Sequence, residues 1–404
     1  MLTRKVAIVS PLRTPIGRFL GALQPLRAEE LAAHVIRAVV ERSGIDPERI
    51  EDVVFAQGYA NSEAPCIGRW AALAAGLPIG VPGMQLDRRC GGGLQSVATA
   101  AMMVSSGTCD VVLAGGVESM SNIEYYTTAM RGGARSGSVQ MFDRLERGRE
   151  RSQPVERFGV ISGMIETAEN LASDYSITRE ASDALAARSH QRAAAAWDVG
   201  RFDAEVVPVS VPQRKGEPVL LARDEGVKPN TTVDSLTKLR PIMHNGTVTA
   251  GNASQQNDAA SACLVVSEDK LAELGLEPIA FFSGWAAHGC EPSRMGIGPV
   301  GAVERLFAKH GVGWADVDLL EINEAFAVQV LACLKAWDLD TAGEWGEKIN
   351  VNGSGISLGH PIGATGLRIM TTLLHEMSRR GVKRGVETMC IGGGQGIAAI
   401  FERP

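Results

Sequence analysis

The chain has 404 residues, an apolar content of 45% and a formal net charge of −6 at pH 7. A chain of this length can bury a large core, and we expect two or three domains rather than one. The sequence has no basic block and no aromatic-interleaved stripe of Lys and Arg, so its charge pattern argues against nucleic acid as a partner.

Short apolar runs recur along the chain, and each is followed by a Gly-rich turn and an Ala-rich helical pattern. This alternation predicts an α/β fold with mixed sheets. The first run begins at Val6, so we expect no signal or transit peptide before it and a cytoplasmic location. The most apolar stretches are too short to cross a bilayer. The predicted strands are residues 6–10, 52–57, 111–115, 319–322 and 388–391.

Two segments of the first half of the chain resemble two segments of the second half, in the same order. The segment "GIDPERIEDVVFA" from Gly44 aligns with "GVGWADVDLLEIN" from Gly311. The segment "VVLAGG" from Val111 aligns with "TMCIGG" from Thr388. We interpret this order as a duplicated unit, with chance similarity of short α/β segments as the alternative.

A segment of different composition separates the two halves. It holds a charged stretch at 141–157, a helical pattern at 178–197 and a Pro/Lys/Arg-rich stretch at 207–241. Such a segment is typical of an inserted loop domain that carries substrate contacts. The predicted domains are residues 1–120 for the N-terminal half, 121–245 for the inserted loop domain, 246–276 for the return of the N-terminal half and 277–404 for the C-terminal half.

The seven cysteines include no C-x-x-C pair and no His spacing that would hold zinc, so we predict free thiols and no metal. Cys90 stands before three glycines and a predicted helix at 97–104. The positive end of a helix dipole lowers a thiol pKa from about 8.5, which favours a nucleophile. The glycines would allow a ligand to approach the backbone closely. The alternative is that Cys90 is a small buried hydrophobe.

Two further Gly-rich loops carry reactive side chains. His360 lies in the loop 352–366, whose glycines nearly match a dinucleotide fingerprint. The spacing is off by one and no suitable acidic residue follows, so we exclude a nicotinamide cofactor. Cys390 follows a predicted strand and opens another Gly-rich turn. Two thiols and an imidazole fit a division of labour in which one thiolate holds an acyl group, the imidazole activates it and the second thiol moves a proton at an α-carbon.

Six motifs, in order along nearly the whole chain, resemble the thiolase family of acetyl-CoA acetyltransferases and 3-ketoacyl-CoA thiolases. The resemblance implies a duplicated α/β core of layered mixed sheets and helices (αβαβα) with an inserted loop domain. It also implies an acyltransferase that reversibly cleaves 3-ketoacyl-CoA by thiolysis, or condenses two acyl-CoA molecules, through an acyl-Cys90 intermediate. The motifs are "CGGGLQS" around Cys90, "GGVESMS" from Gly115, "GTVTAGNAS" from Gly246, "NEAFA" from Asn323, "GHPIGATG" from Gly359 and "CIGGGQG" from Cys390.

The resemblance implies a role for each matching residue. Cys90 would be the acylated nucleophile, His360 its activator and Cys390 the general acid and base for the enolate. His360 and a water held by Asn323 would stabilise the enolate, and the backbone N–H groups of Cys90 and Gly392 would stabilise the tetrahedral intermediate.

Coenzyme A and acyl-CoA are the expected substrates, and no tightly bound cofactor is expected. The resemblance places three residues near the pantetheine and nucleotide of coenzyme A and three more in the acyl pocket. For the two serines among them the alternative is turn chemistry, and for the Met and Phe positions it is ordinary core. The first three are Lys228, Ser235 and Ser254, and the acyl-pocket residues are Met164, Met295 and Phe326.

The sequence departs from the family pattern at one informative place. Gly163, Met164 and Ile165 stand where short-chain acetoacetyl-CoA thiolases have His-Met-Gly, so strict acetoacetyl-CoA specificity is not expected. Gly92 stands where Ser is commoner, which a Gly-rich turn should tolerate. The segment 130–145 resembles the family's tetramerisation loop, and a homodimer or homotetramer is therefore expected.

Two alternative functions are disfavoured by residues that are present. A ketoacyl-acyl-carrier-protein synthase shares the fold but needs a second catalytic His or Asn where this chain has Cys390. A non-catalytic lipid or sterol carrier on the same scaffold would be expected to lose the nucleophile, whereas Cys90 is present together with His360 and Asn323. A thiolase is therefore the favoured interpretation.

Overall fold

The main sheet of the computed structural model, which describes residues 3–404, consists of two halves with the same strand plan. In each half a parallel pair of strands is followed by antiparallel partners, so the pairing order agrees with a duplicated unit. The first half runs β4 (Met84–Leu86), β3 (Asp52–Ala56), β5 (Val111–Ser119), β10 (Asn257–Ser267) and β1 (Val6–Arg13), with the short β2 (Gly17–Arg18) beside β10. The second half continues with β11 (Ala280–Gly289), β14 (Gln395–Glu402), β13 (Arg384–Ile391) and β12 (Leu319–Ile322).

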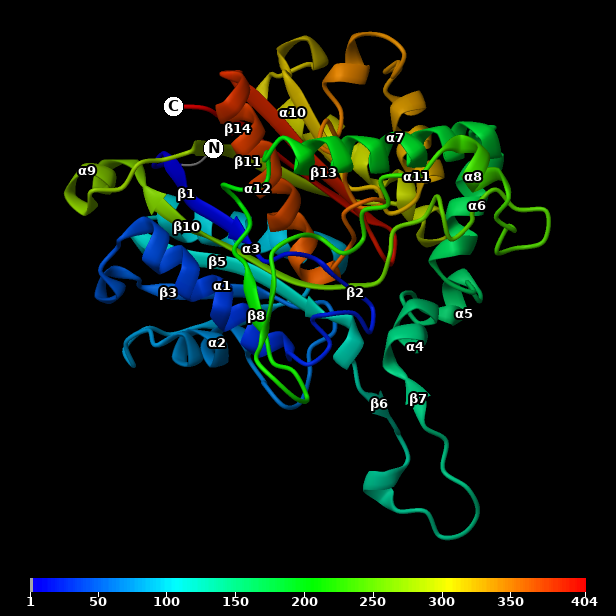
Figure 1. The fold of residues 1–404 in the computed structure, drawn as a ribbon, viewed down its shortest axis with the longest axis horizontal. Coiled ribbons are helices and arrows are strands. Elements are labelled where there is room, and N and C mark those ends of the chain that lie inside the picture. Colours follow the sequence, from blue (N-terminus) through cyan, green and yellow to red (C-terminus); the bar gives the residue numbers. More distant parts are fainter. Residues whose placement is uncertain (1–2) are drawn as a thin grey trace.

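A narrow junction joins the two halves. Strands β1 and β11 pair only through Ala7 with Phe281 and Ile8 with Ala280. The halves therefore form two layers that both face the same pair of central helices (Figure 1). The five predicted strands are confirmed, and β1, β5 and β13 extend beyond their predicted ends.

Helices form the remaining three layers of the core. The outer face of the first half-sheet packs against α1 (Ala28–Ser43) and α2 (Ile67–Ala75). The outer face of the second packs against α10 (Gly298–His310) and α11 (Ala327–Ala336). Between the half-sheets lie α3 (Gly92–Ser105) and α12 (Ile362–Arg380). The order helix, sheet, helix, sheet, helix confirms the αβαβα architecture.

The two central helices touch backbone to backbone. A Cβ atom on Gly93 of α3 would lie 2.6 Å from the backbone nitrogen of Leu367, and one on Gly366 of α12 would lie 2.3 Å from that of Leu94. Both positions therefore require glycine, since any side chain would force the helices apart.

The structure corrects two expectations about the glycines after Cys90. Helix α3 begins at Gly92 rather than at residue 97, so these glycines belong to its first turn and the residue before it. Protein atoms, and not a ligand, occupy the space beside these glycines. A Cβ on Gly91, for example, would lie 2.5 Å from Ile391 Cδ1. Their role is close packing of α3 against the second half of the molecule.

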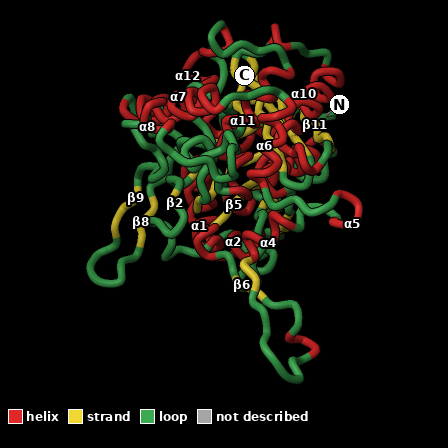
Figure 2. Tube along the Cα trace, turned by 90° about the vertical axis from the view of Figure 1, so that its right-hand side faces the viewer, coloured by secondary structure: helices red, strands yellow, loops and turns green. Residues whose placement is uncertain are grey.

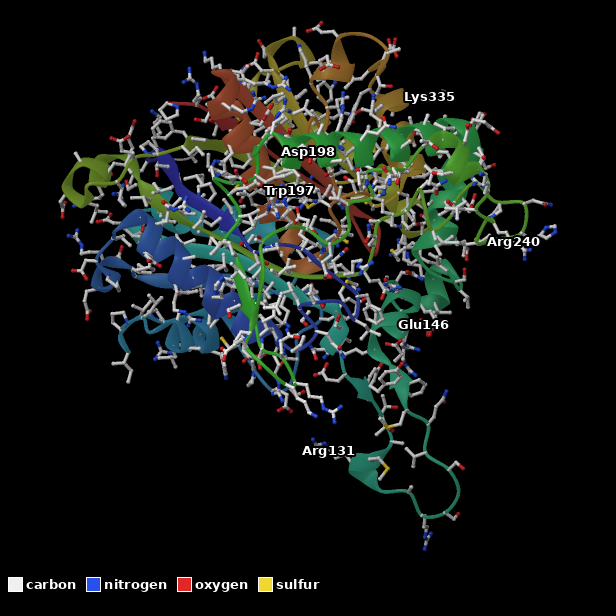
Figure 3. All side chains as sticks on the ribbon, in the orientation of Figure 1. Arg131, Glu146, Trp197, Asp198, Arg240 and Lys335 are labelled. Atoms are coloured by element: carbon white, nitrogen blue, oxygen red, sulfur yellow. The ribbon has the colours of Figure 1, made fainter. Side chains whose placement is uncertain are left out.

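The segment between the halves surrounds the core rather than entering it. Residues 123–143 form a projecting arm that extends away from the body, and the hairpin of β8 and β9 projects separately (Figures 1 and 2). Arg131 lies near the far end of the arm and Glu146 near its base (Figure 3). The elements outside the five layers are β6 (Tyr125–Tyr126), β7 (Phe142–Asp143), α4 (Arg144–Glu150), α5 (Val155–Phe158), α6 (Met164–Asp174), α7 (Arg179–Asp198), β8 (Val209–Val211), β9 (Val219–Leu221), α8 (Val233–Thr237) and α9 (Leu271–Leu274).

The helix predicted at 178–197 is confirmed as α7, whose first turn is capped by the Thr178 side chain accepting from the N–H of Ala181. The predicted domain boundaries stay predictions. Among residues 3–404, no helix has both the length and the apolar content that crossing a membrane requires.

Candidate active site

One cavity of about 590 Å³ brings together the three residues predicted to carry the chemistry. Cys90, His360 and Cys390 all line it, although they come from three distant parts of the sequence. Four of the predicted substrate contacts line the same cavity, and these are Met164, Ser254, Met295 and Phe326. The cavity is therefore the candidate active site.

Cys90 sits in a single turn of 3-10 helix that leads directly into α3. Arg89 before it adopts a positive φ of 45°, an uncommon conformation for a non-glycine residue. The backbone N–H of Gly392 approaches the Cys90 sulfur from the opposite half of the molecule. Both halves therefore contribute to the surroundings of this thiol.

The expected lowering of the Cys90 pKa is wrong for the protein without substrate. Burial of the sulfur among protein atoms raises the pKa, and the Gly392 N–H, the Arg89 charge and the N–H of Cys90 itself only partly oppose this effect. Desolvation outweighs the helix N-terminus because it penalises the charged form directly. The thiol consequently needs a base to become a nucleophile.

His360 provides an imidazole that is neutral in the resting protein. It lies two residues before the start of α12, and its backbone N–H donates to Asn257 Oδ1 at 2.9 Å. Burial, with smaller contributions from the charges of Arg368 and Arg149, lowers the pKa of His360 to about 3. A neutral imidazole beside a thiol can accept its proton.

Asn323 lies at the end of β12 and contacts the imidazole. Its backbone N–H donates to Thr388 on the neighbouring strand at 3.0 Å, and its Nδ2 lies 3.4 Å from His360 Nδ1. The side chain is buried, and within residues 3–404 its Oδ1 has no hydrogen-bond partner. The amide is thus held against His360 with one acceptor oxygen unused by the protein.

Cys390 lies at the end of β13, where the chain turns into β14. Burial, and then the proximity of Cys90, raise the pKa of the Cys390 thiol well above its ordinary value. Gly392 stands in the same turn, and a Cβ there would come within 3.7 Å of the Met164 sulfur. Cys390 therefore rests as a protonated thiol beside the nucleophile.

The wall of the cavity next to Cys390 is apolar. Cys390 belongs to a buried cluster with Met295, Phe326 and Ala325, and Met164 packs against it. The wall extends through Ile165, Ile242 and Met243, which also line the cavity.

Two predicted coenzyme A contacts lie outside the cavity lining, and the prediction for them remains untested. Ser235 is exposed in α8 and forms a capping box with Thr232, so its hydroxyl serves the helix end. Lys228 is exposed, and its backbone N–H donates to His190 Nδ1 at 3.2 Å. Ser254, by contrast, lines the cavity and donates its backbone N–H to Ala325 at 2.9 Å.

Polar lining residues that the sequence did not single out come from two stretches. Gln255 and Gln256 follow the motif "GTVTAGNAS" directly, so an extension of that motif would have found them. Glu146 and Arg149 come from the charged stretch in the segment expected to carry substrate contacts, but nothing in that stretch distinguishes them from their neighbours. All four line the cavity together with Ser162.

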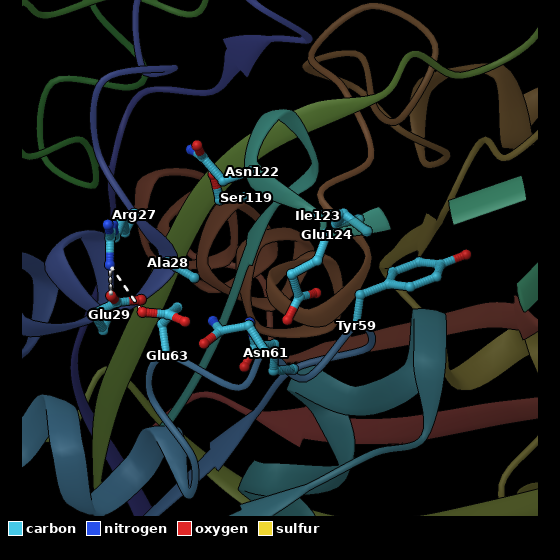
Figure 4. Close-up of a pocket in the computed structure, with 11 residues that line it drawn as sticks. Arg27, Ala28, Glu29, Tyr59, Asn61, Glu63, Ser119, Asn122, Ile123 and Glu124 are labelled. Carbon is cyan, nitrogen blue, oxygen red and sulfur yellow. Dashed lines mark hydrogen bonds and ion pairs between the residues drawn. The ribbon is translucent and has the colours of Figure 1, made fainter. Parts of the chain in front are cut away.

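A second, polar pocket of about 200 Å³ lies where β3 and β5 end and contains none of the predicted site residues. Arg27 forms ion pairs there with Glu63 at 3.7 Å and with Glu29 at 4.0 Å (Figure 4). Within residues 3–404, no group of three or more His, Cys, Asp or Glu side chains is arranged to hold a metal ion.

A thiol and a neutral imidazole that line one cavity, with a second thiol in the same cavity, are the groups that a cysteine-dependent acyl-transfer site requires. Comparison with known families agrees with this class. The family model of the thiolase N-terminal domain matches residues 6–269, and that of the thiolase C-terminal domain matches residues 276–403. The chain belongs to the thiolase family, and it is an acyltransferase of the type that cleaves 3-ketoacyl-CoA by thiolysis or condenses acyl-CoA.

Relatives named acetyl-CoA acetyltransferase and a relative named 3-ketoacyl-CoA thiolase are all similar to the chain. An acetyl-CoA acetyltransferase of Chromobacterium violaceum is 46% identical over 403 residues, covering 99% of this chain and 100% of that protein. A Bacillus anthracis acetyl-CoA acetyltransferase structure matches with a TM-score of 0.94 at 40% identity, covering 100% of both chains. Human mitochondrial 3-ketoacyl-CoA thiolase in complex with CoA matches with a TM-score of 0.93 at 38% identity, covering 100% of this chain and 99% of that one.

Proposed function

We propose that the chain cleaves 3-ketoacyl-CoA by thiolysis through an acyl-thioester on Cys90. The observation that carries the proposal is the convergence of Cys90, His360 and Cys390 on one cavity.

The first step follows from the resting protonation states. The neutral His360 takes the proton of Cys90 as the sulfur attacks the 3-keto carbonyl carbon. The N–H groups of Cys90 and Gly392 stabilise the negative charge on the carbonyl oxygen. The carbon–carbon bond then breaks, leaving the shortened acyl group on Cys90 and releasing the enolate of acetyl-CoA.

The second thiol completes the cleavage. Cys390 rests protonated, so it can donate a proton to the α-carbon of the departing enolate and convert it into acetyl-CoA. His360 and a water donating to Asn323 Oδ1 stabilise the enolate before that transfer. Cys390, left as the thiolate, takes the proton of a new coenzyme A thiol as that sulfur attacks the acyl-Cys90 carbonyl. Cys90 then leaves as the thiolate and recovers its proton from His360. Condensation is the same sequence in reverse, with Cys390 as the base.

We propose further that the substrate range extends beyond acetoacetyl-CoA. The apolar wall of Met164, Met295 and Phe326 continues through Ile165 and offers apolar contact beyond that needed by a methyl group. Each additional methylene in such a pocket is worth roughly 1–3 kcal/mol. Coenzyme A is a substrate in this scheme and not a bound cofactor.

A thiolysis series from acetoacetyl-CoA to long-chain 3-ketoacyl-CoA tests the proposal. We expect kcat/KM to hold or rise as the acyl chain lengthens. Narrowing the wall by Met295→Phe should reduce cleavage of the longer substrates while leaving acetoacetyl-CoA nearly unchanged. Cleavage of acetoacetyl-CoA alone would overturn the wider range, and no cleavage of any member would overturn the function.

We propose that the chain assembles as a dimer or a dimer of dimers. The projecting arm carries apolar side chains that the body of the protein does not cover, with Tyr125 63%, Met130 51% and Met141 59% exposed. Exposed apolar groups of this kind mark protein contact surfaces. Sedimentation velocity of the purified chain tests this, and a monomer at micromolar concentration would contradict it.

A further inference from the structure

His360 is held by a threonine that the catalytic scheme above does not use. Thr365 lies in the first turn of α12 and is fully buried. Its Oγ1 is 2.7 Å from His360 Nδ1 and 2.9 Å from the carbonyl oxygen of Pro361. One hydroxyl therefore contacts both the imidazole and the main chain beside it.

The two contacts are satisfied together when the hydroxyl donates to one partner and accepts from the other, and the proposed role of His360 as a base selects which. A hydroxyl has one proton to donate, and a carbonyl oxygen can only accept. If the Thr365 proton goes to the Pro361 carbonyl, then Oγ1 can only accept from His360, and Nδ1 must carry the hydrogen. The other ring nitrogen, Nε2, is then the unprotonated one. That is the state a base needs on the side of the ring not occupied by Thr365.

The backbone around His360 is anchored without Thr365. The His360 N–H donates to Asn257 Oδ1 at 2.9 Å, and the Gly363 N–H donates to Glu118 Oε2 at 3.0 Å. Asn323 Nδ2 is also a donor and lies 3.4 Å from the same ring nitrogen, so it makes no hydrogen bond to a protonated Nδ1. The contact with Thr365 is thus the short contact to Nδ1, and it decides which ring nitrogen carries the hydrogen.

We infer that Thr365 is a positioning residue that fixes His360 as the Nδ1–H tautomer and so presents Nε2 as the base for Cys90. This inference rests on the proposed role of His360. A ring released from Thr365 can protonate at Nε2 instead, and in that form it cannot take the proton of Cys90.

The test compares two valine variants of the same helix. Thr365→Val removes the hydroxyl at nearly constant volume, and Thr371→Val is the matched control. Thr371 is also buried in α12 and also donates to the carbonyl four residues earlier, Leu367 at 2.8 Å, but it does not contact His360. The readout is the rate at which acetyl-CoA acylates Cys90, followed by quenched-flow intact-protein mass spectrometry. Spectra of protein labelled with ¹⁵N-histidine report the tautomer.

We expect Thr365→Val to acylate about tenfold more slowly, with the KM for acetyl-CoA little changed, because one hydrogen bond to the base is lost. Thr365→Ser should restore the rate, and Thr371→Val should acylate like wild type. The wild-type spectrum should show His360 protonated at Nδ1.

Three results would overturn the inference. These are equal acylation rates for Thr365→Val and Thr371→Val, failure of Thr365→Ser to restore the rate, and a wild-type His360 protonated at Nε2. The last measurement needs no variant, so it decides even if Thr365→Val does not fold. A wild-type protein that never acylates Cys90 would instead overturn the proposed function.

Discussion

The two halves of the sheet share their strand plan but place different chemistry at equivalent positions. Cys90 precedes the central helix α3 of the first half, and His360 precedes the central helix α12 of the second. The alignment of Val111 with Thr388 places Leu113 of β5 at the position of Cys390 in β13. In the proposed scheme, the first half therefore supplies the nucleophile, and the second supplies the base and the acid. A duplicated scaffold provided paired positions, and the site exists only where the halves meet.

The same contrast holds inside the sheet. The third residue pair of the β3–β5 ladder is Val54 with Ala114, and the third pair of the β12–β13 ladder is Glu321 with Glu387. The apolar pair packs into the central layer. Burial raises the pKa of both glutamates well above its ordinary value, although the positive charge of Arg368 opposes this. The second half thus places two buried carboxyl groups where the first half has ordinary core.

Cys90→Ser gives the largest expected effect and tests the contribution of the first half. A serine at the start of α3 keeps the shape of the site but is a far weaker nucleophile, so acyl-enzyme formation should be abolished while the fold persists. Intact-protein mass spectrometry after mixing with acetyl-CoA measures this. Cys66→Ser is the matched control, because Cys66 also stands directly before a helix, α2, but is exposed and far along the chain from the site. An adduct that persists in Cys90→Ser, or one lost in the control, would contradict the assignment.

Cys390→Ala tests the second half and should separate the two half-reactions. Acylation of Cys90 depends on His360 and the backbone donors, so acetyl-Cys90 should still accumulate. Exchange of the α-protons of acetyl-CoA with deuterated water should fall by roughly 10²–10⁴-fold, the usual contribution of general acid–base catalysis.

The control for this variant is Cys333→Ala, which removes a neighbouring buried thiol on α11 that donates to the Gly296 carbonyl rather than facing the site. Its exchange rate should stay near that of wild type. If exchange survives in Cys390→Ala, or acylation is lost to the same extent, the division of roles between the two thiols is wrong.

Glu387→Gln gives the smallest effect and tests the pair inside the sheet. The folded protein holds the Glu387 proton more tightly than the unfolded chain does, so wild-type stability should fall as pH rises above the ordinary glutamate pKa. Glutamine does not titrate, so the variant does not lose stability in this way as pH rises. Its free energy of unfolding should match wild type near pH 4 and exceed it by about 1–3 kcal/mol at pH 8, as expected for an unpaired buried polar group.

Glu402→Gln should show the opposite sign. Hydrogen bonding to Arg384 lowers the pKa of Glu402, so this variant should be less stable than wild type at neutral pH, and the difference should shrink as pH falls below the ordinary glutamate range. Urea unfolding across pH measures both variants. A Glu387→Gln curve parallel to wild type at every pH would show that this glutamate does not titrate in the folded state.

The sequence singled out three residues that the structure brings to one cavity, because each stands in a Gly-rich loop at the end of a regular element. Cys90, His360 and Cys390 were found in this way. The direction of the Cys90 pKa shift could not be predicted, because burial of the sulfur depends on neighbours from the other half of the chain. Strand β10 was missed as well, because it is buried along its whole length and shows no alternation.

Residues whose role depends on strand register or helix contact could not be predicted either. Nothing local marks Glu321 and Glu387 as partners, because the pairing arises only when β12 and β13 lie side by side. The hydroxyl of Ser235 serves a capping box, which the sequence left as an alternative to coenzyme A binding. Arg149 of α4 lines the cavity, but nothing in its charged stretch of sequence distinguishes it from its neighbours.

The contact between Gly93 and Gly366 has a consequence for altering this protein. Main-chain atoms, which have no rotamers, set the separation of the two central helices. Cys90 lies just before α3, and His360 lies just before α12. The apolar wall of the cavity belongs instead to α6, to the turn at Met295 and to the start of α11. In the proposed scheme, acyl selectivity and catalytic spacing thus reside in different parts of the chain. Substrate preference can be redesigned through wall residues such as Met164 while the spacing of Cys90 and His360 stays fixed.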